Sequence, residues 1–369
     1  MSELLQIERP MRATVDAKAF SDALKNARTL LRKSAIPFLE EVHIQFSGGM
    51  CILTGTDLDS WIISELPAQG DDFAFVFSGT KDVERACRYF DGPLTLEMTG
   101  DQEGIISLSC GSRTGEFGVY SAETYPSVPN SKGEVSFHTN VAALLERIRK
   151  VSYATQKPGQ SSKEISSCVE FSGNHVFALD GQRAAWDLDS TQTFPQPFLV
   201  HAEPLHLLKL FGDAQADFYI SAPYLYVMGE SMSTIFRMVE DAPYDLHSAI
   251  PQTYVEEFPV SPKQVLQELR YLNDVVPRAR KLYVYLRGNE LSTTVNGRKY
   301  STALDTGRQD GQAMKFELSH LTEAFKQFEK EPQVKVKISG GITPVVIEAE
   351  GRSDCALVLP TSMKKDAAA

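Results

Sequence analysis

The same succession of predicted elements occurs three times along this chain of 369 residues. Each copy opens with a short strand of alternating polar and apolar residues that ends in Asp, Asn or Ser, and an amphipathic helix follows directly. Self-similarity at a long, fixed period indicates an array of like domains. The opening strands are residues 12–16, 135–140 and 257–261, and their helices are residues 17–31, 141–155 and 262–276.

Each copy continues with a pair of strands, a second amphipathic helix and further strands. The second helices are expected at residues 81–90, from Pro204 onward, and at 319–328 with Ser319 as its N-cap. Two helices against layers of strands give an α+β class with the helices on one face. Sheets of one design can continue from one domain to the next. The predicted parts are an N-terminal extension (1–10), domains over 11–129, 134–251 and 254–363, and a C-terminal tail (364–369).

The distribution of charge is more informative than its sum. The formal net charge is −11, which by itself disfavours a nonspecific nucleic-acid binder. However, the three helix-opening segments 16–33, 140–157 and 261–281 each carry a net charge of +3. Such a helix face is often merely solvated, but three equivalent basic helices in an acidic protein indicate a scaffold with one positively charged face.

Composition and cysteine usage favour a cytoplasmic globular protein. Hydrophobic residues make up 42% of the chain, no apolar run is long enough for a bilayer, and the N-terminus has no apolar signal region. We therefore expect no membrane partner. The five cysteines are scattered, without CxxC spacing, which favours reduced thiols over disulfides or structural zinc.

Motifs for catalysis are not found in the sequence. No nucleophile–base pair, phosphate-binding loop or zinc motif occurs, so we expect no catalytic residue, no metal and no cofactor. Asp57 and Asp59 could be two metal ligands on one side of a strand, but a role in a turn is favoured. A hydrolase or a nucleotide-binding enzyme on an α+β scaffold is the disfavoured alternative.

Three short segments, together with the triplication, resemble the bacterial DNA polymerase III beta subunit, or sliding-clamp, family. Residues 51–59 (CILTGTDLD) resemble a strand and turn of that family's first domain. Residues 177–185 (FALDGQRAA) are similar to its second-domain TDGHRLA element, and 356–363 (ALVLPTSM) to its closing YVVMPMRL. The likeness runs in order from Met11 to Met363.

The resemblance implies a non-catalytic processivity factor: a head-to-tail homodimer that forms a six-domain ring around duplex DNA. Twelve helices of about 10 Å width would leave a lumen of about 27 Å, wide enough for the duplex. DNA binding would be topological and independent of sequence. Lys33 and Gln156 fall where the family places DNA contacts. The remaining candidates for the lumen are Lys25, Arg28, Arg147, Arg149, Lys150, Arg270 and Arg280.

The resemblance also implies two protein interfaces. The dimer seam would join Phe117 and Val119 of one copy to Val275 and Val276 of the other. A peptide pocket would take Leu and Phe side chains from short linear motifs of the DNA polymerase III alpha subunit and the clamp loader. Its residues would be Ile165, Leu179, Gly181, Gln182, Arg183, Ala184, Pro243, Ile342, Pro344, Leu357, Val358, Leu359, Pro360 and Met363.

Several positions depart from the family pattern at this pocket. Ala184 replaces a larger aliphatic residue, Gln182 a histidine, and Thr361–Ser362 an apolar residue and an arginine. The pocket would then be wider, more polar or partly covered by the tail. The alternative function is therefore a clamp-like paralogue with other partners, such as a plasmid, phage or repair clamp.

Overall fold

A computed structural model describes residues 9–99, 104–130, 133–157, 159, 163–242, 244, 250–276, 282–308 and 313–362. The chain forms two compact units. The first comprises Met1–Leu144 with Pro204–Met238, and the second comprises Leu145–Glu203 with Val239–Ala369.

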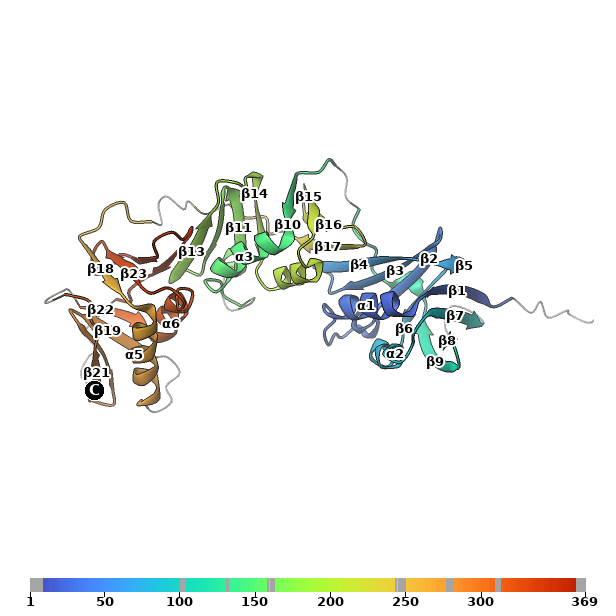
Figure 1. Ribbon diagram of the computed structural model, residues 1–369, viewed down its shortest axis with the longest axis horizontal. Helices are drawn as coiled ribbons and strands as arrows, with labels where there is room; N and C mark the ends of the chain where they lie inside the picture. Colours follow the sequence, from blue (N-terminus) through green and yellow to red (C-terminus); the bar gives the residue numbers. More distant parts are fainter. Residues whose placement is uncertain are drawn as a thin grey trace, which may run out of the picture. The chain divides into compact units, whose positions relative to one another are not determined.

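The first unit is organised around an antiparallel sheet, in which the described part of the chain places 13 strands in the order β10-β15-β16-β17-β4-β3-β2-β6-β9-β8-β7-β1-β5 (Figure 1). The strands are β1 (Met11–Asp16), β2 (His43–Ser47), β3 (Met50–Thr56), β4 (Ser60–Pro67), β5 (Gln69–Gly70), β6 (Phe73–Phe77), β7 (Pro93–Thr99), β8 (Gly104–Cys110), β9 (Arg113–Tyr120), β10 (Phe137–Asn140), β15 (Gln215–Ser221), β16 (Tyr224–Met228) and β17 (Met232–Arg237).

Helix α1 shows how the sequence specifies the helical layer of this unit. The Asp16 carboxylate accepts a hydrogen bond from the Ala19 backbone N–H at 2.8 Å, which caps the helix. Phe20, Ala23, Leu24 and Ala27 recur at helical spacing and are buried. The helical segments of this unit are α1 (Ala17–Arg28), α2 (Thr80–Cys87) and the 3-10 helices η1 (Pro37–Glu40), η2 (Ala122–Thr124) and η4 (Pro204–Phe211).

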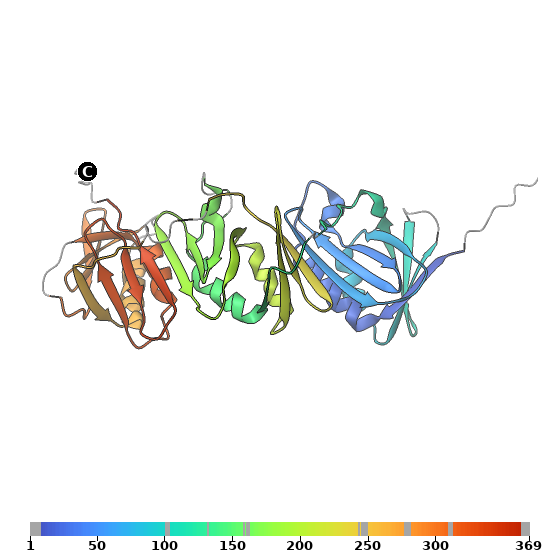
Figure 2. The same cartoon turned by 90° about the horizontal axis from the view of Figure 1, so that it is seen from above.

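The second unit contains an eight-stranded and a four-stranded sheet among its described residues. The strand orders are β14-β11-β12-β13-β25-β24-β23-β18 (Figure 2) and β21-β20-β19-β22. The strands are β11 (Cys168–Gly173), β12 (His175–Leu179), β13 (Arg183–Leu188), β14 (Phe194–His201), β18 (Glu256–Val260), β19 (Tyr283–Arg287), β20 (Glu290–Val295), β21 (Arg298–Ala303), β22 (Met314–Glu317), β23 (Val334–Ile338), β24 (Val345–Glu348) and β25 (Asp354–Val358).

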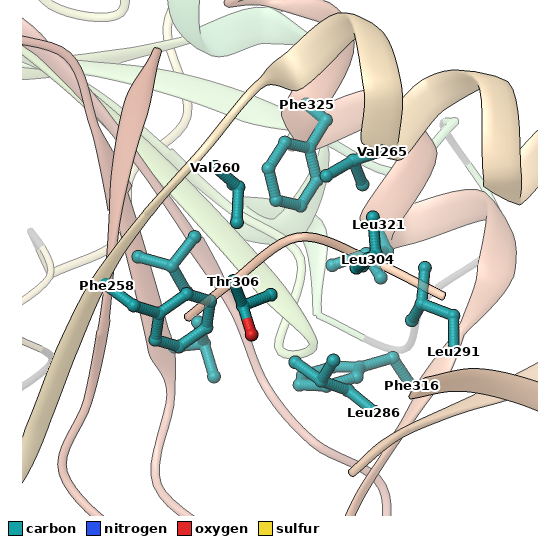
Figure 3. Close-up of a pocket in the computed structure, with 12 residues that line it drawn as sticks. Phe258, Val260, Val265, Leu286, Leu291, Leu304, Thr306, Phe316, Leu321 and Phe325 are labelled. Carbon is teal, nitrogen blue, oxygen red and sulfur yellow. The ribbon is translucent and has the colours of Figure 1, made fainter. Parts of the chain in front are cut away.

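The helices of the second unit pack on these sheets and enclose a core. They are α5 (Pro262–Asp274), α6 (Leu318–Lys326) and the 3-10 helix η3 (Glu164–Ser167); α3 (Val141–Ser152) runs from the first unit into the second. Figure 3 shows Val265 of α5 and Leu321 and Phe325 of α6 pointing into an apolar cavity of about 30 Å³. This volume is about that of one water molecule, so the core is nearly filled.

Two strand pairs join consecutive predicted repeats into single sheets. In the first unit β17 pairs with β4, with Met232 opposite Ser64. In the second unit β13 pairs with β25, with Ala184 opposite Leu357. Both pairs confirm the expectation that sheets continue from one repeat to the next.

The three strand–helix openings are confirmed as β1–α1, β10–α3 and β18–α5. The first helices end two or three residues before their predicted ends, and the second helix of the second copy is a 3-10 helix. The prediction of Ser319 as an N-cap is wrong. Glu317 occupies the cap position, and Ser319, already inside α6, donates its hydroxyl to the Glu317 carboxylate at 2.9 Å. The helix begins at Leu318, one residue earlier than predicted, because this apolar side chain is buried.

In the described part of the chain, none of the helices has the length and apolar character that crossing a membrane requires.

Close packing of α1 on β3 depends on Gly55. A Cβ atom at this position would lie 2.4 Å from the Ala27 carbonyl oxygen, a backbone atom in the last turn of α1. The resemblance motif TGTD therefore contains a glycine because a helix backbone lies directly over the strand.

Replacing Gly55 with alanine is expected to lower the free energy of unfolding by about 1–3 kcal/mol, since α1 must shift to admit the methyl group. Urea denaturation followed by circular dichroism measures the change. Gly340→Ala is the matched control, because its added Cβ would meet only the Thr343 side chain at 3.5 Å. Equal stability of the two variants would contradict this account of the packing.

Candidate functional site

An apolar face on the eight-stranded sheet brings together part of the predicted peptide pocket. Phe177, Ala184, Trp186, Val346 and Leu357 are buried in one cluster, and Leu179 packs against it half-buried. We call these six residues the apolar face. They share one side of the sheet because side chains two apart in a strand point the same way. Phe177, Trp186 and Val346 were missing from the predicted site, although the alternation along β12 and β13 is visible in the sequence.

Tyr244 links this face to the predicted pocket residue Ile165. Ile165 lies in a separate small cluster with Cys168 and Leu199. Tyr244 packs against both clusters, and its ring meets that of Phe177 edge-on at 5.7 Å. Its backbone N–H donates to the buried Glu170 carboxylate at 2.8 Å.

The other predicted pocket residues are placed differently. Val358 lies in the core cluster beneath the third repeat, on the opposite side of β25 from Leu357. Pro360 is buried, Leu359 and Pro344 are half-buried, and Ile342 is 79% exposed. Pro243 and Met363 lie outside the described residues.

The turn at Gly181–Arg183 is built around Asp180. The Asp180 carboxylate accepts hydrogen bonds from the backbone N–H groups of Gln182 and Arg183, both at 2.9 Å. Gly181 adopts a φ of 88°, which favours glycine. Gln182 is exposed, and its carbonyl accepts from the Leu359 N–H at 2.7 Å. The turn is therefore tied to the C-terminal segment of the described chain.

Arg183 connects the turn to α6. Its side chain is only 10% exposed, donates to Asp180 at 2.8 Å and forms an ion pair with Glu323 of α6. The guanidinium is thus committed to two carboxylates of the chain itself. The pairing with Glu323 could not be predicted from the sequence, because Glu323 is distant from Arg183 along the chain.

The buried Asp187 carboxylate forms ion pairs with Arg147 and Lys150, two of the predicted DNA contacts. Arg147 Nε donates to it at 2.7 Å, Lys150 Nζ at 2.7 Å and Ser353 Oγ at 2.6 Å. Burial alone would raise the pKa of Asp187, but the hydrogen bonds from Lys150, Ser353 and Arg147 outweigh it and hold this pKa below its ordinary value. Arg147 is 5% exposed, so its guanidinium stabilises the fold.

Some of the remaining predicted DNA contacts bind other groups of the chain, and others are exposed. Arg28 forms an ion pair with the buried Glu84, and Arg149 pairs with Glu146 at the surface. Gln156 donates its side-chain amide to the Asp180 carbonyl at 3.0 Å. Lys25, Lys33 and Arg270 are exposed. Arg280 lies outside the described residues.

Two strands have unpaired backbone at the positions of the predicted seam. Among the described residues, β21 is an edge strand that pairs only with β20, whereas β9 lies between β8 and β6 and pairs with β6 only at Val119 and Tyr120. Phe117 is half-buried and Val119 lies in the core of the first unit. Val275 is half-buried at the end of α5, and Val276 is buried.

The Asp57 side chain stabilises a turn. Its carboxylate accepts from the backbone N–H of Ser60 at 2.7 Å and of Asp59 at 3.2 Å. Burial raises the pKa of Asp57, and these two hydrogen bonds oppose the rise. The favoured sequence interpretation, a role in a turn, is confirmed.

Solved structures of bacterial sliding clamps superpose on nearly the whole chain. The DNA polymerase sliding clamp from Bacillus subtilis gives a TM-score of 0.81 at 17% identity, with 96% of this chain and 100% of that chain covered. DNA polymerase III subunit beta from Pseudomonas aeruginosa gives 0.81 at 15% identity and the same coverage. The beta subunit from Thermotoga maritima gives 0.80 at 17%, again with 96% and 100% covered.

The chain has the sliding-clamp fold. This confirms the α+β class that the pattern of helices and strands predicted. No protein-family model and no curated protein sequence matches the chain.

Replacing Asp187 with asparagine is expected to lower the free energy of unfolding by about 3–5 kcal/mol, because two buried or half-buried cations lose their counter-charge. The stability that the ionised Asp187 carboxylate contributes should be complete above the ordinary pKa of about 3.9. It should be lost as the pH falls through the lower pKa of Asp187 in the folded state. Urea denaturation at several pH values measures both effects.

The control is Asp82→Asn, which removes an exposed partner of Arg85 and should change stability by less than about 1 kcal/mol. If Asp187→Asn lowered the free energy of unfolding by no more than this control does, the ion pairs at Asp187 would not stabilise the fold.

Proposed function

We propose that this protein is a DNA sliding clamp, in which two copies close into a ring around duplex DNA and tether a polymerase to it. The observation that carries the proposal is the superposition of 96% of this chain on the whole of the bacterial clamp chains. The protein would supply no chemistry of its own and would act by raising the effective concentration of its partner at the DNA.

The edge strand β21 and the part of β9 that does not pair with β6 support ring closure by a second copy. An unpaired edge leaves backbone N–H and C=O groups without partners and invites pairing with another chain. Head-to-tail pairing of β9 of one copy with β21 of the other would satisfy both edges. Phe117 and Val275 would add apolar contact at this seam, beside the buried Val119 and Val276.

The predicted division into three clamp domains, at 11–129, 134–251 and 254–363, gives such a dimer six domains. Lys25, Lys33 and Arg270 are the predicted DNA contacts that are exposed and best available for phosphates. Their contacts with DNA would be weak, sequence-independent and sensitive to salt.

The edge of the apolar face supports capture of a short peptide. Leu179 is half-buried there, beside the exposed polar turn at Gly181–Gln182, and an apolar contact flanked by polar groups suits an extended segment that inserts Leu and Phe side chains. The DNA polymerase III alpha subunit and the clamp loader are the proposed sources of such segments.

A clamp-like paralogue with other partners is the second candidate. The observation in its favour is the composition of the apolar face, where the small Ala184 lies among the rings of Phe177 and Trp186. A peptide from the host's replicative polymerase would bind a replicative clamp but not such a paralogue.

Retention on DNA tests the ring directly. After loading by a clamp loader, the protein is expected to stay on circular plasmid and to slide off the same plasmid once it is linearised. Solution mass, measured alongside, should be that of a dimer, and Val275→Asp should shift it towards a monomer. Val255→Asp, at a valine that is 77% exposed, is the control. Equal retention on circular and linear DNA would overturn the proposal.

Truncation of Leu179 tests the peptide site. Leu179→Ala should weaken binding of a fluorescent peptide with adjacent Leu and Phe by about tenfold, or 1.4 kcal/mol. Fluorescence anisotropy measures the affinity, and circular dichroism verifies folding. Leu188→Ala, at an exposed leucine ending β13 of the same sheet, should bind as the unmodified protein does. Equal affinities for all three proteins would rule out the apolar face as the site.

A further inference from the structure

Two adjoining cavities lie along β18, the edge strand that pairs with β23 in the eight-stranded sheet (Figure 1). Their volumes are about 720 and 700 Å³, and Pro259 of β18 and Gln333, just before β23, line both of them. We call the two cavities together the β18 groove. All of its lining residues belong to the second unit. Each cavity has the size of a typical ligand-binding cleft.

Carboxylates predominate around the β18 groove. Among the lining residues that the structure describes, two are basic, Arg308 and Lys335. Six are acidic: Glu256, Glu257, Asp305, Glu331, Glu348 and Glu350. A cleft lined mostly by one sign of charge attracts ligands of the opposite sign. The groove therefore favours a cationic ligand and disfavours one that carries phosphates.

Asp305 and Glu350 carry the negative charge that the chain leaves unbalanced. Both are exposed, and among the described residues neither side chain forms a hydrogen bond or an ion pair. The other carboxylates each pair with a cation of the chain: Glu256 with Arg308, Glu257 with Lys335, Glu331 with Arg352 and Glu348 with Lys337. Asp305 and Glu350 line different cavities of the groove. They can therefore bind two separate cations of one ligand.

Arg308 adds a buried hydrogen-bond donor to the groove lining. Its side chain is 3% exposed, and its Nε and Nη2 donate to the Glu256 carboxylate at 2.5 and 2.7 Å. The guanidinium carbon lies 4.8 Å from the centre of the Phe258 ring. Among the described residues, Nη1 has no hydrogen-bond partner. A buried donor without a partner is unfavourable, so a carbonyl oxygen that enters the groove beside Arg308 would be stabilised.

The edge strand limits what can occupy the groove. Pro259 lies within β18 and has no backbone N–H, which disfavours addition of a second chain as a regular strand. A bound segment would therefore be held mainly through its side chains. Pro259 and Pro332 are exposed in the lining, and their rings can pack against the aliphatic stems of Lys and Arg. A metal ion is disfavoured, because the described residues include no group of three or more His, Cys, Asp or Glu that could hold one.

We propose that the β18 groove binds an extended segment of a partner protein that is rich in lysine or arginine. Two cations of the segment would lie against Asp305 and Glu350, and one main-chain carbonyl would accept from Arg308 Nη1. The groove shares no residue with the apolar face. The inference goes beyond the proposed function and does not depend on ring closure or on DNA.

The test measures binding of the full-length protein to a short fluorescent peptide of alternating lysine and alanine, which has no Leu or Phe for the apolar face. Fluorescence anisotropy should show binding, and a peptide of alternating glutamate and alanine should not bind. Asp305→Asn/Glu350→Gln should weaken binding about fivefold at low salt, because two ion pairs are lost. The difference should shrink as salt screens the charges.

Two further variants make the test specific. The matched control is Asp22→Asn/Glu230→Gln, which makes the same change in charge at exposed carboxylates of the first unit and should leave the affinity unchanged. Arg308→Lys keeps the positive charge beside Glu256 but removes the Nη1 donor. It should weaken binding about threefold, and circular dichroism verifies that this variant is folded.

Four results would overturn the inference. The first is no binding of the lysine peptide, or an equal loss of affinity in the control. The second is unchanged affinity of Arg308→Lys, which would reduce the groove to a charged surface. The third is an equal loss with Leu179→Ala, which would place the peptide on the apolar face. The fourth is a lower solution mass for Asp305→Asn/Glu350→Gln than for the unmodified protein, which would make a second copy the occupant.

Discussion

Backbone hydrogen bonding between strands of successive repeats is the constraint on which this structure depends. β17 pairs with β4 in the first unit, and β13 pairs with β25 in the second. A strand with an unpaired edge leaves polar backbone groups exposed to other chains, so a repeat that ends in such an edge is completed by its neighbour. Among the described residues, unpaired backbone groups of this kind remain on the edge strand β21 and on the part of β9 that does not pair with β6.

Charged groups in the second unit fall into two classes that the sequence does not distinguish. Arg147, Lys150 and Arg183 are engaged with carboxylates of the chain, and they stabilise the packing of helices on the sheet. Arg270 and Lys326 are exposed beside a groove between α5 and α6. Arg147, Lys150 and Arg270 all contribute to the excess positive charge of the basic helix segments. The first class stays engaged within the fold, because a buried charge that loses its partner costs several kcal/mol.

In the candidate peptide site, too, the sequence pattern predicts some of the neighbours and the tertiary structure decides the others. Alternation along β12 and β13 places Phe177 with Leu179 and Ala184 with Trp186, and this can be read from the sequence. That the face also includes Val346 and Leu357 depends on the register of β13 with β25, more than 150 residues away along the chain. The same register places Val358 on the other side, in the core.

The sequence by itself determined the α+β class, the three strand–helix openings and the continuity of the sheets, because these follow from local periodicity and from repetition. It also marked the turn at Asp57, where short-range geometry leaves few choices. Only the tertiary structure decided which basic residues are free, that α6 starts at Leu318, and that Arg183 neutralises Glu323. Those outcomes depend on which side chains distant elements bring within a few ångströms, and no local pattern encodes such distances.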